Sequence, residues 1–208
     1  MGQYYQPTIL KKNWKTAKNG VAASLKCYDF DNGAKLMEHS YVGNYFVAAV
    51  SYLLSLDKYF GLPFVWCGDY ADNIKTNLGE RNIYDEGGDF IYDEGETNTN
   101  RTKAYNELFS SVKKANYQEW GDKVYLVNLT KKQYVKVPKY KENEWAVHPL
   151  PLLTCDGNGR GCGDYMLDGY ELDSRIGSWA FDRIGVVKDI ADYKDFNEID
   201  GHWESDMM

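Results

Sequence analysis

The chain has 208 residues and a mass of 23.9 kDa, a length typical of one domain that buries a full hydrophobic core. Aromatic residues make up 15% of it, with 18 Tyr, 6 Trp and 8 Phe, and this content excludes a disordered chain. The net charge of -7 and the sequence pI of about 5.0 exclude non-specific binding to duplex DNA, which requires Lys and Arg against phosphate.

The first 41 residues are predicted to form three strands. Residues 4–10 read as a strand in which Pro7 indicates an edge position or a bulge. Residues 21–30 and 34–41 are two further runs, joined by Asp31-Asn32-Gly33. Asn-Gly between two such runs is the strongest short-range hairpin signal, and we therefore predict a hairpin here.

Two main helices are predicted, over about 44–59 and about 100–117. At the start of the first, Asn44 is a preferred N-cap residue, and apolar positions follow it at helical spacing. In the second, apolar residues recur at intervals of three and four from Tyr105 onward. A short core strand is expected at 64–67, between the two helices.

An acidic stretch also lies between these helices, and we predict that it forms a solvated loop over 84–100. The string Ile-Tyr-Asp-Glu-Gly occurs at 83–87 and again at 91–95. Six carboxylates fall between Asp85 and Glu96 with no basic residue among them, a pattern typical of a solvated surface. A divalent-cation site is the alternative interpretation.

The C-terminal half is predicted to contribute strands. Residues 123–129 and 133–137 alternate around Thr130-Lys131-Lys132 and predict a second hairpin. The apolar run 145–153 and residues 177–187 are counted as the last two strands.

The tail over 189–208 is acidic and aromatic, and we expect it to be partly ordered. The predicted strands occur as hairpins instead of alternating with helices. The sequence therefore predicts a single α+β domain over 1–208 with a mostly antiparallel sheet.

The glycine-rich loop from Cys155 to Tyr165 is the most informative segment for function. Glycine recurs at every second position from 157 to 163, and successive exposed N–H groups can form an anion-binding nest, to which Arg160 adds a guanidinium suited to phosphate. The residues of this loop predicted to bind a phosphorylated ligand are Asp156, Gly157, Asn158, Gly159, Arg160, Gly161, Asp164 and Tyr165. The alternative is a loop whose Arg160 points to water.

No cofactor and no metal ion are predicted. The loop lacks the Lys-Ser or Lys-Thr of a P-loop, and the dinucleotide spacing Gly-x-Gly-x-x-Gly does not occur in it. It imitates the start of a calcium loop, but Arg160 and Leu167 stand where oxygen ligands belong. The four cysteines, at 27, 67, 155 and 162, lack zinc-ligand spacing and are expected to be reduced thiols.

Aromatic residues at strand ends and beside loops can stack on a nucleobase. We assign this role to Trp66, Tyr70 and Trp179, together with Tyr165, and we expect Asp69 to bond a ribose or a base edge. The tripeptide Gly-Asp-Tyr occurs at 68–70 and again at 163–165. For both tryptophans the alternative is a place in the core.

The possibility of an enzyme rests on the histidines. His39 follows Glu38 and His148 precedes Pro149, so His39, His148 and Asp156 are the candidate acid–base groups. Adjacent residues of a strand point to opposite faces, which separates Glu38 from His39 and favours a structural role for each histidine. No nucleophile motif such as Gly-x-Ser-x-Gly is present.

Five strings are distinctive as motifs, and together with the spacing between them they cover most of the chain from about residue 28 to residue 187. They are Lys35-Leu36-Met37-Glu38-His39-Ser40, Val65-Trp66-Cys67-Gly68-Asp69-Tyr70-Ala71-Asp72, His148-Pro149-Leu150-Pro151-Leu152-Leu153, Asp156-Gly157-Asn158-Gly159-Arg160-Gly161 and Gly177-Ser178-Trp179-Ala180. With their spacing they resemble a family of uncharacterised accessory proteins of tailed phages and of prophages in gut bacteria. Cys162 stands where that pattern has glycine. The resemblance implies a phage accessory protein in the cytoplasm of the bacterial host and transfers no catalytic residue.

The first functional hypothesis is therefore a non-enzymatic counter-defence protein that binds and sequesters a small phosphorylated or nucleotide signal of the host. One alternative is a hydrolase that cleaves such a nucleotide with His39, His148 and Asp156. Another is an acidic inhibitor that contacts a host defence protein through residues 85–96 and the tail. No apolar run reaches the length of about 18 residues that spans a bilayer, so no membrane partner is expected. Exposed strand edges allow a homo-oligomer.

Overall fold

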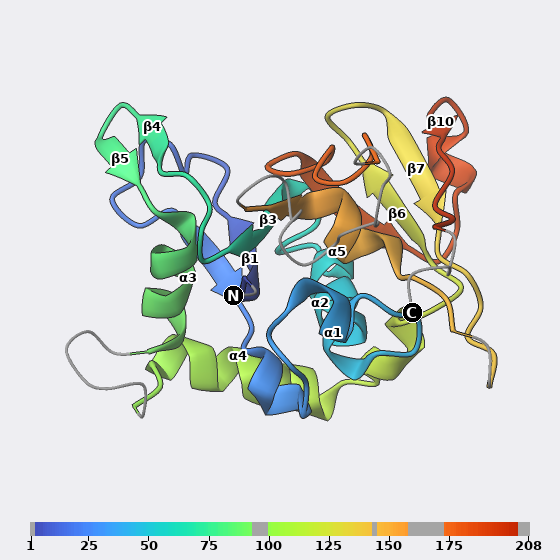
Figure 1. Cartoon of the computed structure of the whole chain (residues 1–208), viewed down its shortest axis with the longest axis horizontal. Coiled ribbons are helices and arrows are strands. Elements are labelled where there is room, and N and C mark those ends of the chain that lie inside the picture. The colour runs from blue at the N-terminus through green and yellow to red at the C-terminus, as the bar shows by residue number, and fades with distance from the viewer. Residues whose placement is uncertain (1–2, 93–99, 143–144, 158–172, 204–208) are drawn as a thin grey trace.

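A mostly antiparallel sheet of eight strands organises the residues that the computed structural model describes, namely 3–92, 100–142, 145–157 and 173–203 (Figure 1). The strand order is β10-β7-β6-β9-β3-β1-β2, with β8 paired to β3 beside this path. The pairs β3–β8 and β7–β10 are parallel. The strands are β1 (Tyr5–Leu10), β2 (Val21–Ser24), β3 (Leu62–Gly68), β6 (Tyr125–Asn128), β7 (Gln133–Lys136), β8 (Cys155–Asp156), β9 (Arg183–Val187) and β10 (Asn197–Glu198), and a separate two-stranded sheet contains β4 (Ile74–Thr76) and β5 (Gly79–Arg81).

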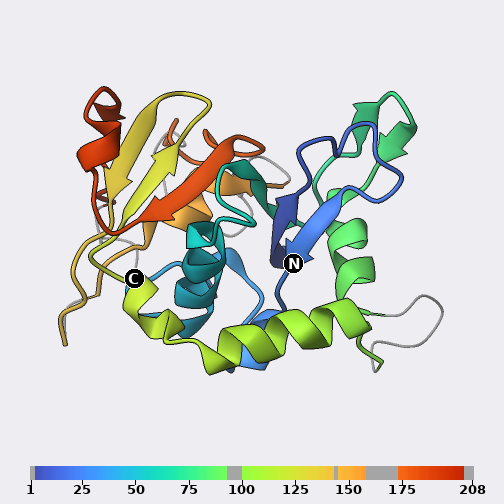
Figure 2. The same cartoon turned by 180° about the vertical axis from the view of Figure 1, so that it is seen from behind.

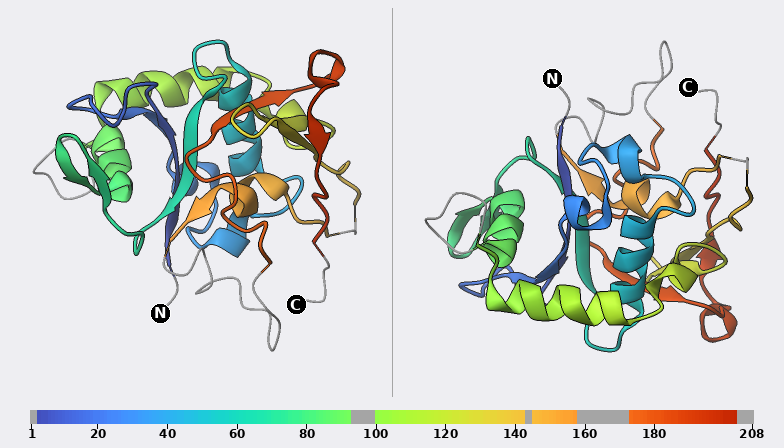
Figure 3. Two further views of the ribbon diagram at one scale, coloured as in Figure 1. Left: turned by 90° about the horizontal axis from the view of Figure 1, so that it is seen from above. Right: turned by 90° about the horizontal axis from the view of Figure 1, so that it is seen from below.

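Helices fill the space between the two halves of the sheet and cover its sides. Figure 2 shows α2 standing between the β1–β2 half and the β6–β7–β9 half. Figures 2 and 3 show α4 running along one side of the molecule, from α3 toward η2. The helices are α1 (Leu36–His39), α2 (Tyr45–Ser55), α3 (Ile83–Ile91), α4 (Lys103–Lys114) and α5 (Pro149–Thr154), with 3-10 turns η1 (Cys27–Phe30), η2 (Tyr117–Trp120) and η3 (Ala191–Tyr193).

Strand β3 connects the two halves of the sheet. Its first two residues, Leu62 and Pro63, pair with β9, whereas the rest of the strand pairs with β1 as far as Gly68. All five residues from Phe64 to Gly68 are buried, as expected for a strand that is covered on both faces. Strand β8 runs parallel to β3, so Asp156 at the end of β8 lies beside Cys67 near the end of β3.

Helices α2 and α4 correspond to the two helices expected from the sequence, although both are shorter. The Asn44 side chain accepts hydrogen bonds from the first turn of α2, at 2.8 Å from the Phe46 amide. The Thr102 hydroxyl does the same for α4, at 3.0 Å from the Tyr105 amide. Both helices stop where the next residue turns to extended backbone, at Leu56 and Ala115. Strands β6 and β7 pair where the second hairpin was expected.

The hairpin predicted around Asp31-Asn32-Gly33 is wrong. β2 ends at Ser24 and is followed by η1 and α1, and the hairpin partner of β1 is β2, joined through residues 11–20. Asp31 takes a left-handed backbone with φ 53°, which ends η1 without reversing a strand. Cys27 and Phe30 are buried together at a spacing of three, so burial follows a helical period here.

The acidic loop predicted over 84–100 is also wrong for its first half, which is helix α3; residues 93–99 lie outside the described structure. The Asn82 side chain caps the helix by accepting from the Asp85 amide at 3.1 Å. Asp85 and Glu86 lie in the first turn, where their negative charges interact favourably with the positive end of the helix dipole. Ile83, Gly87 and Ile91, spaced by four, form its buried face.

We expect Gly87→Ala to destabilise the protein and Gly88→Ala, one residue later in the same helix, to stabilise it. A Cβ at Gly87 would lie 2.3 Å from Gln6 Nε2 and 2.8 Å from Thr8 Oγ1, whereas nothing lies within 4 Å of a Cβ at Gly88. Overpacking costs about 1–3 kcal/mol, and alanine in place of an unconstrained helical glycine gains up to about 1 kcal/mol. Urea unfolding measures both, and equal effects would contradict the close packing of α3 on β1.

The run predicted as a strand over 145–153 differs in its second part, which belongs to helix α5. His148 caps this helix and Pro149 starts it, because Pro is favoured in the first helical turn. Residues 189–203 of the tail are built into the fold through η3 and β10. Arg175 holds this tail by donating from Nη1 to the carbonyls of Asp200 and His202, both at 2.9 Å.

Candidate functional site

Trp66 and Trp179 lie in the hydrophobic core, which corrects their predicted role as stacking residues. Both are fully buried, and stacking on a ligand requires an exposed ring face. The Trp66 indole donates to His39 Nε2 at 2.8 Å and packs against Phe46. The Trp179 indole donates to Gln133 Oε1 at 3.0 Å. Their polar atoms are therefore satisfied inside the protein.

Of the predicted ligand residues around the ends of β3 and β8, the structure places Asp156 beside the end of β3. Asp156 pairs in register with Cys67, and Asp69 Oδ1 accepts the backbone N–H of Tyr4 at 3.0 Å. Tyr70, with half of its side chain exposed, lies outside this contact. A Cβ at Gly157 would lie 2.8 Å from Tyr5 Oη, so the backbone needs glycine there. The remaining predicted ligands, Asn158, Gly159, Arg160, Gly161, Asp164 and Tyr165, lie outside the described residues.

The histidines proposed as acid–base groups are fully buried and neutral. Burial lowers the pKa of His39 to about 4 and the pKa of His148 to about 3. His148 Nδ1 accepts the Leu150 amide at 3.2 Å and so caps α5. A general acid or base must reach its substrate, and neither ring is accessible to one. Both histidines are therefore structural residues.

A small pocket lined with tyrosines lies at the start of β1, and we call it the tyrosine pocket. It has a volume of about 140 Å³ and is formed by β1, η1, α3 and the segments next to them. Its lining residues are Tyr4, Tyr5, Gln6, Lys26, Cys27, Tyr28, Ala34 and Tyr84.

The rings around the tyrosine pocket combine exposed faces with neutral hydroxyl groups. The side chains of Tyr4 and Tyr28 are 49% and 59% exposed, respectively, so both present ring surface to solvent. Tyr84 is half-buried, and burial together with the nearby Asp69 carboxylate raises its pKa to about 12. At neutral pH its phenol therefore keeps its proton and can donate a hydrogen bond.

Among the described residues that line the tyrosine pocket, Lys26 has the only charged side chain. Its Nζ lies 5.3 Å from the ring centre of Tyr28 and 5.0 Å from that of Tyr92. Its backbone N–H donates to Tyr105 Oη at 3.2 Å, and that hydroxyl donates to the Asp29 carboxylate. A buried network thus fixes the backbone from which the Lys26 side chain extends.

Gln6 provides a second polar group at the tyrosine pocket. It is 7% exposed, and its Nε2 has no hydrogen-bond partner among the described residues. A buried amide donor without a partner costs free energy, which a ligand acceptor would offset. The pocket therefore combines aromatic faces, one cation and an amide donor, and carries no carboxylate in its lining.

Sequence reasoning missed the tyrosine pocket because its residues come from distant segments. Tyr4 directly precedes β1, and Tyr84 belongs to α3. Lys26 directly precedes η1, and Tyr28 lies within it. Each of these segments has its own local sequence pattern. No local pattern states that these segments meet. The one available signal was the excess of tyrosine. It predicts either a core whose edges contact solvent through Tyr hydroxyls or surfaces on which a ligand stacks.

The described part of the chain offers no site for a metal ion among its His, Cys, Asp and Glu residues. No group of three or more His, Cys, Asp or Glu residues there is arranged to hold a metal ion. The cysteines at 27, 67 and 155 are buried, and Cys162 lies outside the described residues. None of the helices in the described ranges is both long and apolar enough to cross a membrane.

The chain was compared with protein-family models, with curated proteins and with solved structures. None of the three comparisons found a match.

Proposed function

We propose that the chain is a non-enzymatic binding protein that captures a small nucleotide-like ligand in the tyrosine pocket. The observation that carries this proposal is a pocket of about 140 Å³ with exposed Tyr rings and Lys26 as its only charge. A dry cavity of about 150 Å³ is known to accommodate benzene, so the volume suits one planar ring. The rest of the ligand would extend toward solvent past Tyr4 and Tyr28.

The chemistry of the lining favours an anionic ligand over a neutral one. Tyrosine faces stack on bases of any sequence, and Lys26 attracts phosphate as a point charge. Gln6 and the protonated Tyr84 supply donors for base or ribose acceptors. Gly157, the first residue of the predicted phosphate loop, lies beside Tyr5 of the same pocket.

The biological role that fits this proposal is sequestration of a host immune signal. The resemblance to phage accessory proteins supports it, because a counter-defence protein can act by holding a nucleotide signal without cleaving it. The two histidines considered for cleavage are inaccessible, which removes the main support for a hydrolase. A ligand recovered intact after long incubation is therefore expected.

We expect Lys26→Gln to weaken binding of the phosphorylated ligand at least tenfold, because it removes the one cation of the tyrosine pocket. The screen is a thermal-shift panel of cyclic nucleotides, NAD derivatives and ADP-ribose derivatives. A ligand at about a hundred times its Kd adds about 2.7 kcal/mol to the free energy of unfolding, which makes a hit easy to see.

The matched control is Lys113→Gln, because Lys113 Nζ also lies over two aromatic rings, those of Phe30 and Phe109, outside the pocket. Its affinity for the hit should equal that of the wild type. Equal loss in both lysine variants, or no hit in the panel, would count against the tyrosine pocket. A hit that disappears during incubation would identify an enzyme instead.

A further inference from the structure

A second pocket, separate from the tyrosine pocket, lies where the start of α2 meets η2 and the segment after β7. We call it the second pocket, and its volume is about 280 Å³. Its lining residues are Gly43, Tyr45, Ala48, Gln118, Gly121, Asp122 and Tyr140. None of these residues belongs to the proposed nucleotide site.

Small residues line the second pocket, and one of them lets Tyr140 approach the backbone closely. Gly43 has a left-handed backbone with φ 90°, and a Cβ there would lie 2.6 Å from Cδ2 of Tyr140. A Cβ at Gly121 would lie 3.0 Å from that of Ala48. The Tyr45 side chain, at the first position of α2, is 57% exposed, and that of Tyr140 is 52% exposed. The second pocket is therefore lined by two exposed tyrosines together with small residues.

The charge of the second pocket is opposite to that of the tyrosine pocket. Among the described residues that line it, Asp122 is the only charged one, and none of them is Lys, Arg or His. Asp122 Oδ2 accepts the Tyr140 amide at 2.7 Å, which fixes the orientation of the carboxylate. Its Oδ1 has no hydrogen-bond partner among the described residues. One carboxylate oxygen therefore remains for a ligand donor, beside two rings whose faces attract cations.

We propose that the second pocket binds a guanidinium group. A guanidinium is planar, stacks on tyrosine faces and donates several N–H groups to a carboxylate, whereas an ammonium cannot stack. Four of the five arginines of the chain (81, 101, 175 and 183) bond to other parts of the described structure, so they do not fill this pocket. The guanidinium would come from a free arginine-like molecule or from an arginine side chain of a protein.

The test is an NMR titration with N-acetyl-arginine amide, with N-acetyl-citrulline amide as the neutral, nearly isosteric comparison. We expect saturable shifts of the Tyr45 and Tyr140 signals with the arginine derivative and none with the citrulline derivative. Asp122→Asn keeps an acceptor for the Tyr140 amide but removes the charge, and it should weaken binding at least tenfold. Tyr45→Leu removes one ring from an exposed position and should also weaken it.

Matched controls separate this site from general charge effects. Asp57→Asn removes an exposed carboxylate just beyond α2, outside the lining of the pocket, and Tyr28→Leu removes an exposed ring of the tyrosine pocket; both should leave the arginine titration unchanged. Agmatine represents a free arginine-like molecule and an arginine-containing peptide represents an arginine side chain of a protein. The probe that binds more tightly identifies the source. Absence of saturable shifts, equal binding of citrulline, or unchanged affinity in Asp122→Asn would overturn the proposal.

Discussion

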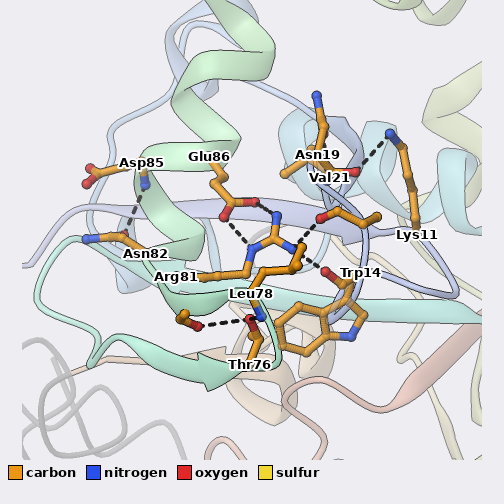
Figure 4. A network of polar contacts seen from close by, with 12 residues as sticks. Lys11, Trp14, Asn19, Val21, Thr76, Leu78, Arg81, Asn82, Asp85 and Glu86 are labelled. Carbon is orange, nitrogen blue, oxygen red and sulfur yellow. Dashed lines mark hydrogen bonds and ion pairs between the residues drawn. The ribbon is translucent and has the colours of Figure 1, made fainter.

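Replacing Arg81 with Met is expected to lower the free energy of unfolding by about 3 kcal/mol, because it leaves a partly buried carboxylate without its partner. Arg81 is 7% exposed and joins β5 to the start of α3 and to the β1–β2 connection (Figure 4). Its Nε donates to Glu86 Oε1 at 2.6 Å. Its Nη1 donates to the carbonyls of Trp14 and Ala17. Methionine fills much of the same volume and replaces none of these donors.

The backbone beside Arg81 leaves space for its guanidinium group only because a glycine stands there. A Cβ at Gly20 would lie 2.7 Å from Arg81 Nη2, so glycine is needed where the connection passes the side chain. Glu86 belongs to α3, and its side chain is 25% exposed. The ion pair is therefore partly screened by solvent. For this reason we expect a loss of unfolding free energy at the lower end of the range found when buried ion pairs are broken.

A double variant separates the unpaired charge from the lost packing. Arg81→Met combined with Glu86→Leu leaves no unpaired carboxylate, so it should be more stable than Arg81→Met alone. Lys103→Met, at the exposed pair with Glu107 whose N–O distance is 3.8 Å, should change stability little. Urea unfolding measures all three variants. If Arg81→Met and Lys103→Met had equal effects, the network would not stabilise the fold.

Acidification from pH 7.5 to 5.5 is expected to remove about 2–3 kcal/mol of stability through His39 and His148. Burial holds their pKa values at about 4 and about 3, below the usual value of 6.5. Below about pH 6.5 the unfolded chain therefore binds protons that the native protein does not, and the equilibrium shifts toward unfolding. The contribution of the two neutral histidines to the free energy of unfolding is fully present above this pH. It decreases as the pH is lowered further toward the native pKa values.

His148→Asn tests this pH dependence with the helix cap retained. Asparagine is a preferred N-cap residue and does not titrate, so the loss of stability between pH 7.5 and 5.5 should fall to about half. His202→Asn is the matched control for the loss of one histidine, because His202 is exposed. The measurement is urea unfolding at several pH values. A profile of His148→Asn that parallels the wild type would show that His148 is protonated in the native state.

The sequence by itself determined the elements whose signals are local. Periodicity and the caps Asn44 and Thr102 place α2 and α4 within a few residues, because a helix satisfies its own backbone and its first-turn amides need nearby acceptors. The pairing of β6 with β7 is equally local, since only four residues separate the strands. Together these elements were enough to predict an α+β chain with a mostly antiparallel sheet.

Only the tertiary structure decided the elements whose local signals point elsewhere. The turn at Asn32-Gly33 has a hairpin signature, but Cys27 and Phe30 gain more from burial in the core as part of η1. The acidic stretch around Asp85 becomes helix α3 because Gly87 lets it pack on β1 and Arg81 neutralises Glu86. Strand β1 is distant in sequence from Gly87, and although Arg81 is only five residues before Glu86, its side chain also donates to the distant carbonyls of Trp14 and Ala17.

The tertiary structure also decided the candidate sites. Periodicity states which face of an element a residue occupies, and it does not state which elements meet. Trp66 and Trp179 were therefore placed at a ligand surface although they fill the core, and Tyr4 and Tyr84 were passed over although they line one pocket. A binding pocket is a property of several segments at once, and the packing of β1 against η1 and α3 creates this one.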